Sequence, residues 1–337
     1  MENIIDRKKE RSSRRVVVFG GAGYLGTVLA GQLLNRGYQV EVFDSFRFGR
    51  ESLAAYEGRP GFSLRVGDIR DIGAVTESIQ GAYACMLLAA LVGEPACDLD
   101  PKETVDVNLI ATKAVAEACL HYQVPRFFFA STDSAYGIKE GIMVEDAPLN
   151  PISLYARLKA QVEAEILGLG NGDFRPIILR MATIYGYSPR MRFDLIINIL
   201  TLHAFTKGKI TIFGGKQWRP LLHVADAARA YVLSLEAPLE AVGGQIFNVG
   251  SNGQNYQVGE LGELVRQVFP EVHIETVPQT PDLRDYHVSF DKITKYLGYQ
   301  VQCSVADGIR EIRRAFESGS IKDHQDPRYY NVPRRQG

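Results

Sequence analysis

The glycine pattern Gly20-x-x-Gly23-x-x-Gly26 constrains the fold of this chain more than any other feature. It follows the apolar run 16–19, which is typical of a buried strand, and precedes a segment, 27–35, with helical periodicity. Glycine permits a tight turn, a close approach of backbone to ligand, and close packing of a helix on a strand. The N–H groups and the dipole at the start of that helix favour a pyrophosphate. The pattern predicts a dinucleotide-binding turn whose cofactor-lining residues are Gly20, Gly23, Tyr24, Leu25 and Gly26.

An acidic residue, Asp44, ends the next predicted strand, 39–43. Its carboxylate can accept hydrogen bonds from both ribose hydroxyls of an adenosine and would repel a 2′-phosphate. The sequence therefore favours NAD over NADP as the cofactor. Arg47 and Arg50 follow in the adjoining loop, where they would either pair with a 2′-phosphate or remain solvated.

A second acidic segment, Asp68-Ile69, follows another strand at the edge of the sheet where such folds bind ligands. We expect these two residues to meet the adenine of the cofactor. The alternative is that Asp68 caps a helix that starts near Asp71.

The first half of the chain alternates short apolar runs with amphipathic segments. Continuous apolar runs are typical of strands covered on both faces, which indicates a parallel sheet. We expect an α/β fold, namely a Rossmann-type doubly wound parallel sheet with a smaller C-terminal α/β substrate lobe. The NAD-binding domain would span 1–180 and be rejoined by about 221–250, with a mainly substrate-binding lobe at 181–337. The other expected strands are 83–88, 126–130, 177–179 and 246–249, and the other helices are 102–121, 154–167 and 224–235.

Charge and cysteine content restrict the partners. With 38 basic and 39 acidic residues the net charge is −1, which gives no field that would attract nucleic acid or an anionic membrane. No apolar segment approaches the roughly 20 residues needed to cross a bilayer. The four cysteines have no CxxC spacing, so we expect reduced thiols in the cytoplasm and neither disulfides nor a metal site.

Tyr155 and Lys159 are four residues apart on the predicted helix 154–167, so both side chains project from one face. An ammonium beside a phenol is expected to lower the pKa of Tyr155 from about 10 toward neutrality, and bound NAD⁺ adds positive charge. Such a tyrosine can remove a hydroxyl proton while hydride leaves the same carbon. Thr132, in the polar cluster that follows the preceding strand, can hydrogen-bond the same oxygen, with turn chemistry as its alternative role.

Together these motifs resemble the extended short-chain dehydrogenases, specifically their nucleotide-sugar epimerase/dehydratase branch. The resemblance covers nearly the whole chain. It rests on the glycine pattern, Ser131-Thr132-Asp133, Tyr136-Gly137, Tyr155-x-x-x-Lys159, Ala89-Ala90, Trp218-Arg219-Pro220 and Asp282-Leu283-Arg284. These motifs are specific for the branch and leave the reaction open.

The resemblance implies roles for the residues that match. Thr132, Tyr155 and Lys159 would form the catalytic triad, with Lys159 also holding the nicotinamide ribose. Ala89 and Ala90 would line the cofactor. It further implies a homodimer formed through the helices that bear Asn108 and Tyr155.

Arg219 and Arg284 would grip the diphosphate of a nucleotide-diphosphate sugar, a role that suits guanidinium groups. The alternative for both is solvated loop charge. Many members of the branch have asparagine where this chain has Thr183, so that diphosphate contact is in doubt. Arg190 and Arg192 are candidates for a substitute.

The reaction itself depends on the residues after Thr132. Dehydratases of this branch carry an Asp-Glu pair there, and the glutamate acts as a base at the fifth carbon of the sugar. This chain has Asp133-Ser134 as substrate-site residues, which counts against 4,6-dehydration. We expect an NAD-dependent epimerase that transfers hydride at a sugar hydroxyl carbon, C4, with Tyr155 as the base. The alternatives are a nucleotide-sugar dehydrogenase or 4-ketosugar reductase, then a 4,6-dehydratase or a non-catalytic dinucleotide-binding regulator.

Overall fold

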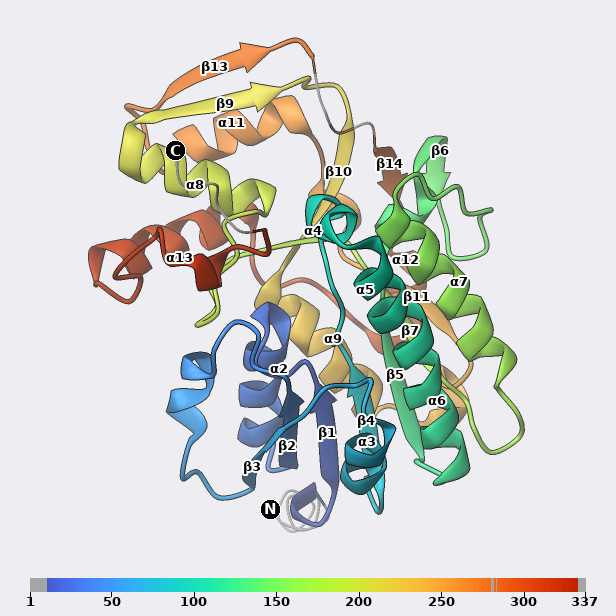
Figure 1. Ribbon diagram of the computed structural model, residues 1–337. Coiled ribbons are helices and arrows are strands. Elements are labelled where there is room, and N and C mark those ends of the chain that lie inside the picture. The colour runs from blue at the N-terminus through green and yellow to red at the C-terminus, as the bar shows by residue number, and fades with distance from the viewer. Residues whose placement is uncertain (1–10, 280–281, 283, 333–337) are drawn as a thin grey trace.

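The computed structural model describes residues 11–279, 282 and 284–332. Its central sheet has seven strands in the order β11-β7-β5-β4-β1-β2-β3, and every neighbouring pair is parallel (Figure 1). The order reverses direction between β1 and β4, as in a doubly wound Rossmann sheet. The predicted fold class is therefore confirmed. The strands are β1 (Arg15–Phe19), β2 (Gln39–Asp44), β3 (Phe62–Val66), β4 (Ala84–Leu87), β5 (Arg126–Thr132), β7 (Ile177–Met181) and β11 (Ile246–Val249).

Helices cover both faces of this sheet, which explains its continuous apolar strands. Val16 and Val18 of β1 belong to the core on one face, whereas Val17 and Phe19 belong to the core on the other. The first face is covered by α2 (Tyr24–Asn35) and α9 (Val224–Glu236), which pack on each other. The second is covered by α3 (Ile72–Ile79), α6 (Thr112–His121) and α7 (Leu154–Gly168).

The segment 102–121 is not the single regular helix that its periodicity predicts. It divides into α5 (Pro101–Val105), a π-helical turn η2 (Asp106–Ala111) and α6. The side chain of Asn108 accepts a hydrogen bond from the backbone N of Leu91 at 2.8 Å and donates one to its carbonyl at 2.8 Å. This two-way bond holds η2 against the loop after β4, and such π-helical turns occur mostly at functional sites.

The second lobe combines three small sheets with four helices (Figure 1). Strand β10 (Trp218–His223) lies between β8 (Thr183–Tyr185) and β12 (Asn255–Gln257), β9 (Lys209–Phe213) pairs with β13 (His273–Val277), and β6 (Ile138–Met143) pairs with β14 (Asp285–Val288). The helices are α8 (Ile196–Lys207), α11 (Val258–Arg266), α12 (Asp291–Leu297) and α13 (Val305–Glu317). The other short helices of the described residues are η1 (Glu51–Tyr56), α4 (Glu94–Leu99), η3 (Asp133–Tyr136), α10 (Leu239–Val242), η4 (Asn252–Gln254) and η5 (Pro327–Tyr329).

The chain crosses between the lobes more than once. After β10 it forms α9 and then β11, which pairs in parallel with β7 at the edge of the central sheet. Tyr24 of the glycine turn links the lobes directly, because its hydroxyl donates to the carbonyl of Gly186 at 2.6 Å and accepts from Asn198 at 3.0 Å. Within the described residues, no helix is long and apolar enough to cross a membrane.

Candidate active site

The glycine turn is shaped by two close backbone approaches. Gly20 has φ of 79°, and a Cβ there would lie 2.7 Å from the backbone N of Ala89. A Cβ on Gly26 would lie 2.3 Å from the carbonyl oxygen of Gly20, so α2 can pack closely on β1 only without that side chain. Gly23 begins α2 without a capping side chain, and no acidic residue lies in the first turn of the helix. The N–H groups at this helix end are thus available to a phosphate, and the turn fits a dinucleotide.

Asp44 lies at the carboxyl end of β2, beside this turn. Its carboxylate accepts hydrogen bonds from the backbone N of Ala22 at 3.0 Å and of Phe46 at 2.8 Å. Burial raises the pKa of Asp44, and these two bonds together with the nearby guanidinium of Arg190 oppose that shift. Arg47 pairs with Glu103 at 3.0 Å, so its guanidinium is engaged. The arrangement suits a ribose with free hydroxyls.

Asp68 is held by its own neighbour. Its carboxylate accepts two side-chain bonds from Arg70, at 3.0 and 2.6 Å, and the ion pair lowers the pKa of Asp68. The helix that follows is capped by Asp71, which accepts from the backbone N of Ala74 at 3.1 Å. The alternative that Asp68 caps this helix is therefore wrong. Asp68 and Ile69 remain at the carboxyl edge of β3, where an adenine contact stays a proposal.

Tyr155 and Lys159 lie in the first turns of α7, whose N-terminus is capped by Ser153. The hydroxyl of Thr132 lies close enough to the phenol of Tyr155 to affect its pKa, so β5 and α7 bring these two side chains together. Lys159 is only 2% exposed, and its ammonium donates to the carbonyl of Ala130 at 2.8 Å. Burial lowers the pKa of Lys159 to about 8.

The pKa of Tyr155 moves in the direction opposite to the prediction. Its burial, with the nearby carboxylate of Glu94, raises the pKa of the phenol, and the charge of Arg192 and the nearby hydroxyl of Thr132 only partly oppose this. The ammonium of Lys159 lies 6.0 Å from the centre of the phenol ring and points at a backbone carbonyl. The expected lowering is thus wrong for the protein without cofactor, because desolvation outweighs the distant ammonium.

A buried ion pair connects α7 to β7 of the central sheet. Glu163 and Arg180 are both 3% exposed in their side chains and lie 2.5 Å apart. Glu163 also accepts from Ser131 at 2.7 Å, and Arg180 donates to Tyr136 at 2.8 Å. The network ties α7 to β5, η3 and β7, and so fixes the register of Tyr155 above the sheet.

Asp133 is 1% exposed, and among the described residues no donor lies within hydrogen-bond distance of either carboxylate oxygen. Burial raises the pKa of the Asp133 carboxyl well above its ordinary value, and the nearby charge of Arg180 opposes this shift. Its neighbour Ser134 instead faces Arg284, whose guanidinium donates to the hydroxyl at 3.2 Å.

Arg219 and Arg284, 65 residues apart, meet at one carboxylate. Asp282 lies 2.8 Å from Arg219 and 2.6 Å from Arg284. Arg284 also pairs with Glu94 at 2.9 Å. The two guanidinium groups therefore share one carboxylate, and Arg284 reaches both Ser134 and Glu94, the carboxylate that affects the pKa of Tyr155. Paired guanidinium groups of this kind can hold a diphosphate.

The remaining candidates divide between the two halves of the site. Arg192 pairs with Asp194 at 2.6 Å and lies near enough to Tyr155 to affect the pKa of its phenol. Arg190 lies instead near Asp44, on the cofactor side. Thr183 lies in β8, opposite Leu221 of β10.

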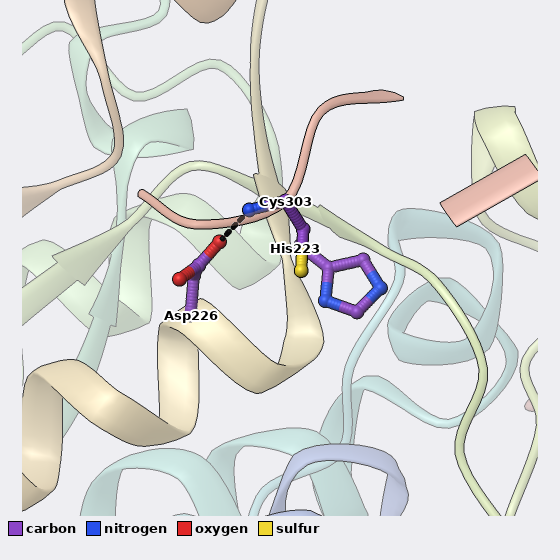
Figure 2. Close-up of side chains that lie close together, drawn as sticks. All are labelled: His223, Asp226 and Cys303. Atoms are coloured by element: carbon purple, nitrogen blue, oxygen red, sulfur yellow. Dashed lines mark hydrogen bonds between the residues drawn. The ribbon is translucent and has the colours of Figure 1, made fainter. Parts of the chain in front are cut away.

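Figure 2 shows His223, Asp226 and Cys303 close together at the start of α9. Both oxygens of Asp226 accept backbone N–H bonds from the segment 302–303, at 2.9 to 3.0 Å. Nδ1 of His223 accepts from Ala225 at 3.2 Å, and Nε2 lies 2.9 Å from Glu311. Both oxygens of Asp226 and Nδ1 of His223 thus accept from backbone N–H groups, and the bonds of Asp226 fasten the chain that leads into α13.

Known proteins share this combination of fold and residues. The model of the NAD dependent epimerase/dehydratase family matches residues 16–250. A UDP-glucose 4-epimerase of Corynebacterium glutamicum is 30% identical over 328 residues, covering 90% of this chain and 96% of the relative. UDP-glucuronic acid decarboxylase 1 of Arabidopsis thaliana is 27% identical, covering 94% and 72%. A dTDP-glucose 4,6-dehydratase of Streptomyces venezuelae, solved with NAD bound, superimposes with a TM-score of 0.81 at 27% identity, covering 91% and 98%.

The chain belongs to the NAD dependent epimerase/dehydratase family. This confirms the branch inferred from the sequence, and NAD is the cofactor. Sequence reasoning missed Glu94, which lies in a Gly-Glu-Pro segment four residues after the Ala89-Ala90 motif and matches no motif itself. Its only signal is its place after β4, at the ligand-binding edge of the sheet.

Proposed function

We propose that the protein is a nucleotide-sugar 4-epimerase in which Tyr155 is the catalytic base. The observation that carries the proposal is the contact between the two halves of the site. Thr132 lies close to Tyr155 at one end, and Arg284 donates a hydrogen bond to Ser134, two residues along the chain from Thr132, at the other. A sugar whose diphosphate is held by Arg284 and Arg219 would therefore present a ring hydroxyl to Tyr155.

Each residue then has a defined task. Tyr155 takes the proton of the C4 hydroxyl, and Thr132 hydrogen-bonds the same oxygen. Lys159 holds the nicotinamide ribose, and its positive charge stabilises the phenolate form of Tyr155 that accepts this proton. When bound, NAD⁺ supplies the hydride acceptor for the sugar carbon, and its reduced form returns the hydride. Inversion requires that the 4-keto sugar turn its other face before Tyr155 gives the proton back.

The substrate lobe, 181–337, supplies the diphosphate grip. In the protein without substrate, Asp282 and Glu94 neutralise the two arginines, and a diphosphate would replace these carboxylates as their partner. The relatives named above act on UDP- and dTDP-linked sugars, which supports a nucleotide-diphosphate sugar as the substrate class.

Two other outcomes use the same triad. A dehydrogenase or 4-ketosugar reductase would release the keto sugar or begin from it. A 4,6-dehydratase needs a base at the fifth carbon, and Ser134 cannot supply one. One observation favours the dehydratase as the second candidate. Glu94 pairs with Arg284, which also donates to Ser134, so a carboxylate lies beside Ser134.

The test is product analysis with Tyr155→Phe as the matched variant. NAD-loaded protein is incubated with a panel of nucleotide-sugars, and the products are identified by mass spectrometry and NMR. Epimers at C4 support the proposal, a mass loss of water indicates dehydration, and net NADH formation indicates a dehydrogenase. Tyr155→Phe should lower kcat by about 10²- to 10⁴-fold while NAD binding is retained. The control is Tyr122→Phe, at the exposed tyrosine that follows α6, and it should leave kcat unchanged. Full activity of Tyr155→Phe would remove the phenol from the mechanism.

We further infer a homodimer in the cytoplasm. The homodimer is supported by exposed apolar side chains beside α7, Leu99 on α4 and Ile110 on η2. The compartment is supported by buried free thiols at Cys85, Cys97 and Cys119, which suit a reducing environment.

A further inference from the structure

The chain turns back toward the cofactor after α13. Residues 326–331, the C-terminal strap, follow the loop that leaves this helix. Its carbonyl at Tyr329 accepts a hydrogen bond from the backbone N of Phe193 at 3.0 Å. Tyr330 is 8% exposed and lies in the same apolar cluster as Phe193 and Tyr24. The strap is therefore packed on the molecule at a point where the two lobes meet.

Two contacts fasten the strap to the Rossmann sheet. Arg328 pairs with Glu51, in the segment after β2, at 2.6 Å. Asn331 donates to the carbonyl of Val92, in the segment after β4, at 2.9 Å. In the sheet β1 lies between β2 and β4. The strap therefore bridges the loops that follow the two strands on either side of β1, the strand that leads into the glycine turn.

Arg190 connects the strap to the adenosine side of the site. Its guanidinium donates to the side-chain oxygen of Asn331 at 2.6 Å and lies 3.9 Å from the ring centre of Phe48. The residue is only 4% exposed. Within the described part of the chain, its Nε has no acceptor, although Asp44 is close enough to affect its pKa. A buried N–H donor without an acceptor is unfavourable. Because Arg190 lies near Asp44, where the ribose of the cofactor is expected, the cofactor would supply the acceptor for its Nε.

We propose that the C-terminal strap and Arg190 form the outer wall of the NAD site and keep the cofactor bound from one turnover to the next. Arg190 donates to the adenosine half of NAD through Nε, and Asn331 holds Arg190 in place. NAD then leaves only when the bonds of Asn331 and Arg328 open. The inference rests on NAD binding at the glycine turn and does not depend on which sugar reaction follows.

The test measures release of the cofactor in the absence of any sugar. Full-length protein loaded with NADH is mixed with excess NAD⁺, and the decay of energy transfer from protein to NADH gives the dissociation rate. In the double variant Asn331→Ala/Arg328→Ala the strap keeps its backbone and its apolar contacts but loses its bonds to both loops. We expect dissociation to become about ten- to a hundredfold faster, the effect of losing one or two such bonds. Arg190→Gln should also accelerate it.

The control is Arg310→Ala, which removes an exposed arginine paired with Asp307 on α13. It should leave the dissociation rate unchanged. The two single strap variants are measured as well, with circular dichroism to verify folding, so that the result does not depend on one protein. An unchanged rate in folded strap variants would overturn the proposal, even if Arg190→Gln released NADH faster. Since no sugar is present, failure of the proposed epimerisation would not affect this result.

Discussion

Lys159 illustrates at the residue scale how function works against stability. The ammonium is buried between Phe129 and the carbonyl of Ala130, and its pKa is lowered to about 8. Because the unfolded chain keeps an ordinary lysine pKa of about 10.4, folding must desolvate a charge at every pH below 8. That cost disappears as the pH rises from about 8 to 10.4, where the folded protein has already lost the proton.

We therefore predict a pH-dependent stability difference between the wild type and Lys159→Met. Between pH 8 and 10.4 the free energy of unfolding of the wild type should rise relative to the variant, by up to about 3 kcal/mol. Urea unfolding at several pH values measures the difference. Lys113→Met, which removes an exposed lysine paired with Glu165, is the control and should show no such slope. A stability difference that does not depend on pH would mean that the pKa of Lys159 is not lowered in the folded state.

At the scale of elements, the pair Glu163–Arg180 joins α7 to the sheet below the catalytic residues. Removing one member leaves a buried charge without its partner, so Glu163→Gln should lower the free energy of unfolding by about 3 to 5 kcal/mol. The double variant Glu163→Gln/Arg180→Met should regain much of this loss, because no charge is then buried. Denaturant unfolding of four proteins, the wild type, Glu163→Gln, Arg180→Met and the double variant, gives the coupling energy.

An exposed pair provides the comparison. Glu263 and Arg266 lie 2.7 Å apart on α11, and Glu263→Gln should change stability by less than about 1 kcal/mol. If the double variant at Glu163 and Arg180 were as unstable as the sum of the two single ones, the pair would not be coupled. Tyr155 would then owe its position to other contacts.

The whole molecule presents an apolar surface beside α7. Leu99 is 64% exposed and Ile110 59%, and the elements that carry them, α4 and η2, both pack against α7. Exposed apolar side chains on neighbouring elements can be covered in an interface, and a two-fold axis here would bring two copies of α7 together. We predict that Ile110→Glu converts a dimer to a monomer, because each copy would bury an unpaired carboxylate. Sedimentation velocity measures the change.

Phe213→Glu is the matched substitution on the far lobe. Phe213 is 47% exposed in β9, and its replacement should leave the dimer intact. A wild-type protein that sediments as a monomer at micromolar concentration would contradict the inferred assembly.

The sequence by itself determined the fold class and the cofactor. The predicted strand 16–19 and helix 154–167 agree with β1 and α7 to within one residue at each end, because apolar periodicity is a local property of the chain. The turn at Gly20 could also be found in this way, since its requirement for glycine arises between neighbouring elements. Tyr155 and Lys159 share a face for the same reason, as one turn of helix separates them.

Tertiary structure alone decided the contacts between distant segments and the electrostatics that follow from them. Asp282 joins Arg219 to Arg284, Glu94 comes to the sugar side, and Asn331 reaches the loop after β4, although no local pattern marks these meetings. The raised pKa of Tyr155 likewise depends on burial by several elements. A sequence pattern reports which face a residue takes within its own element, whereas desolvation and pairing depend on what the rest of the chain places against that face.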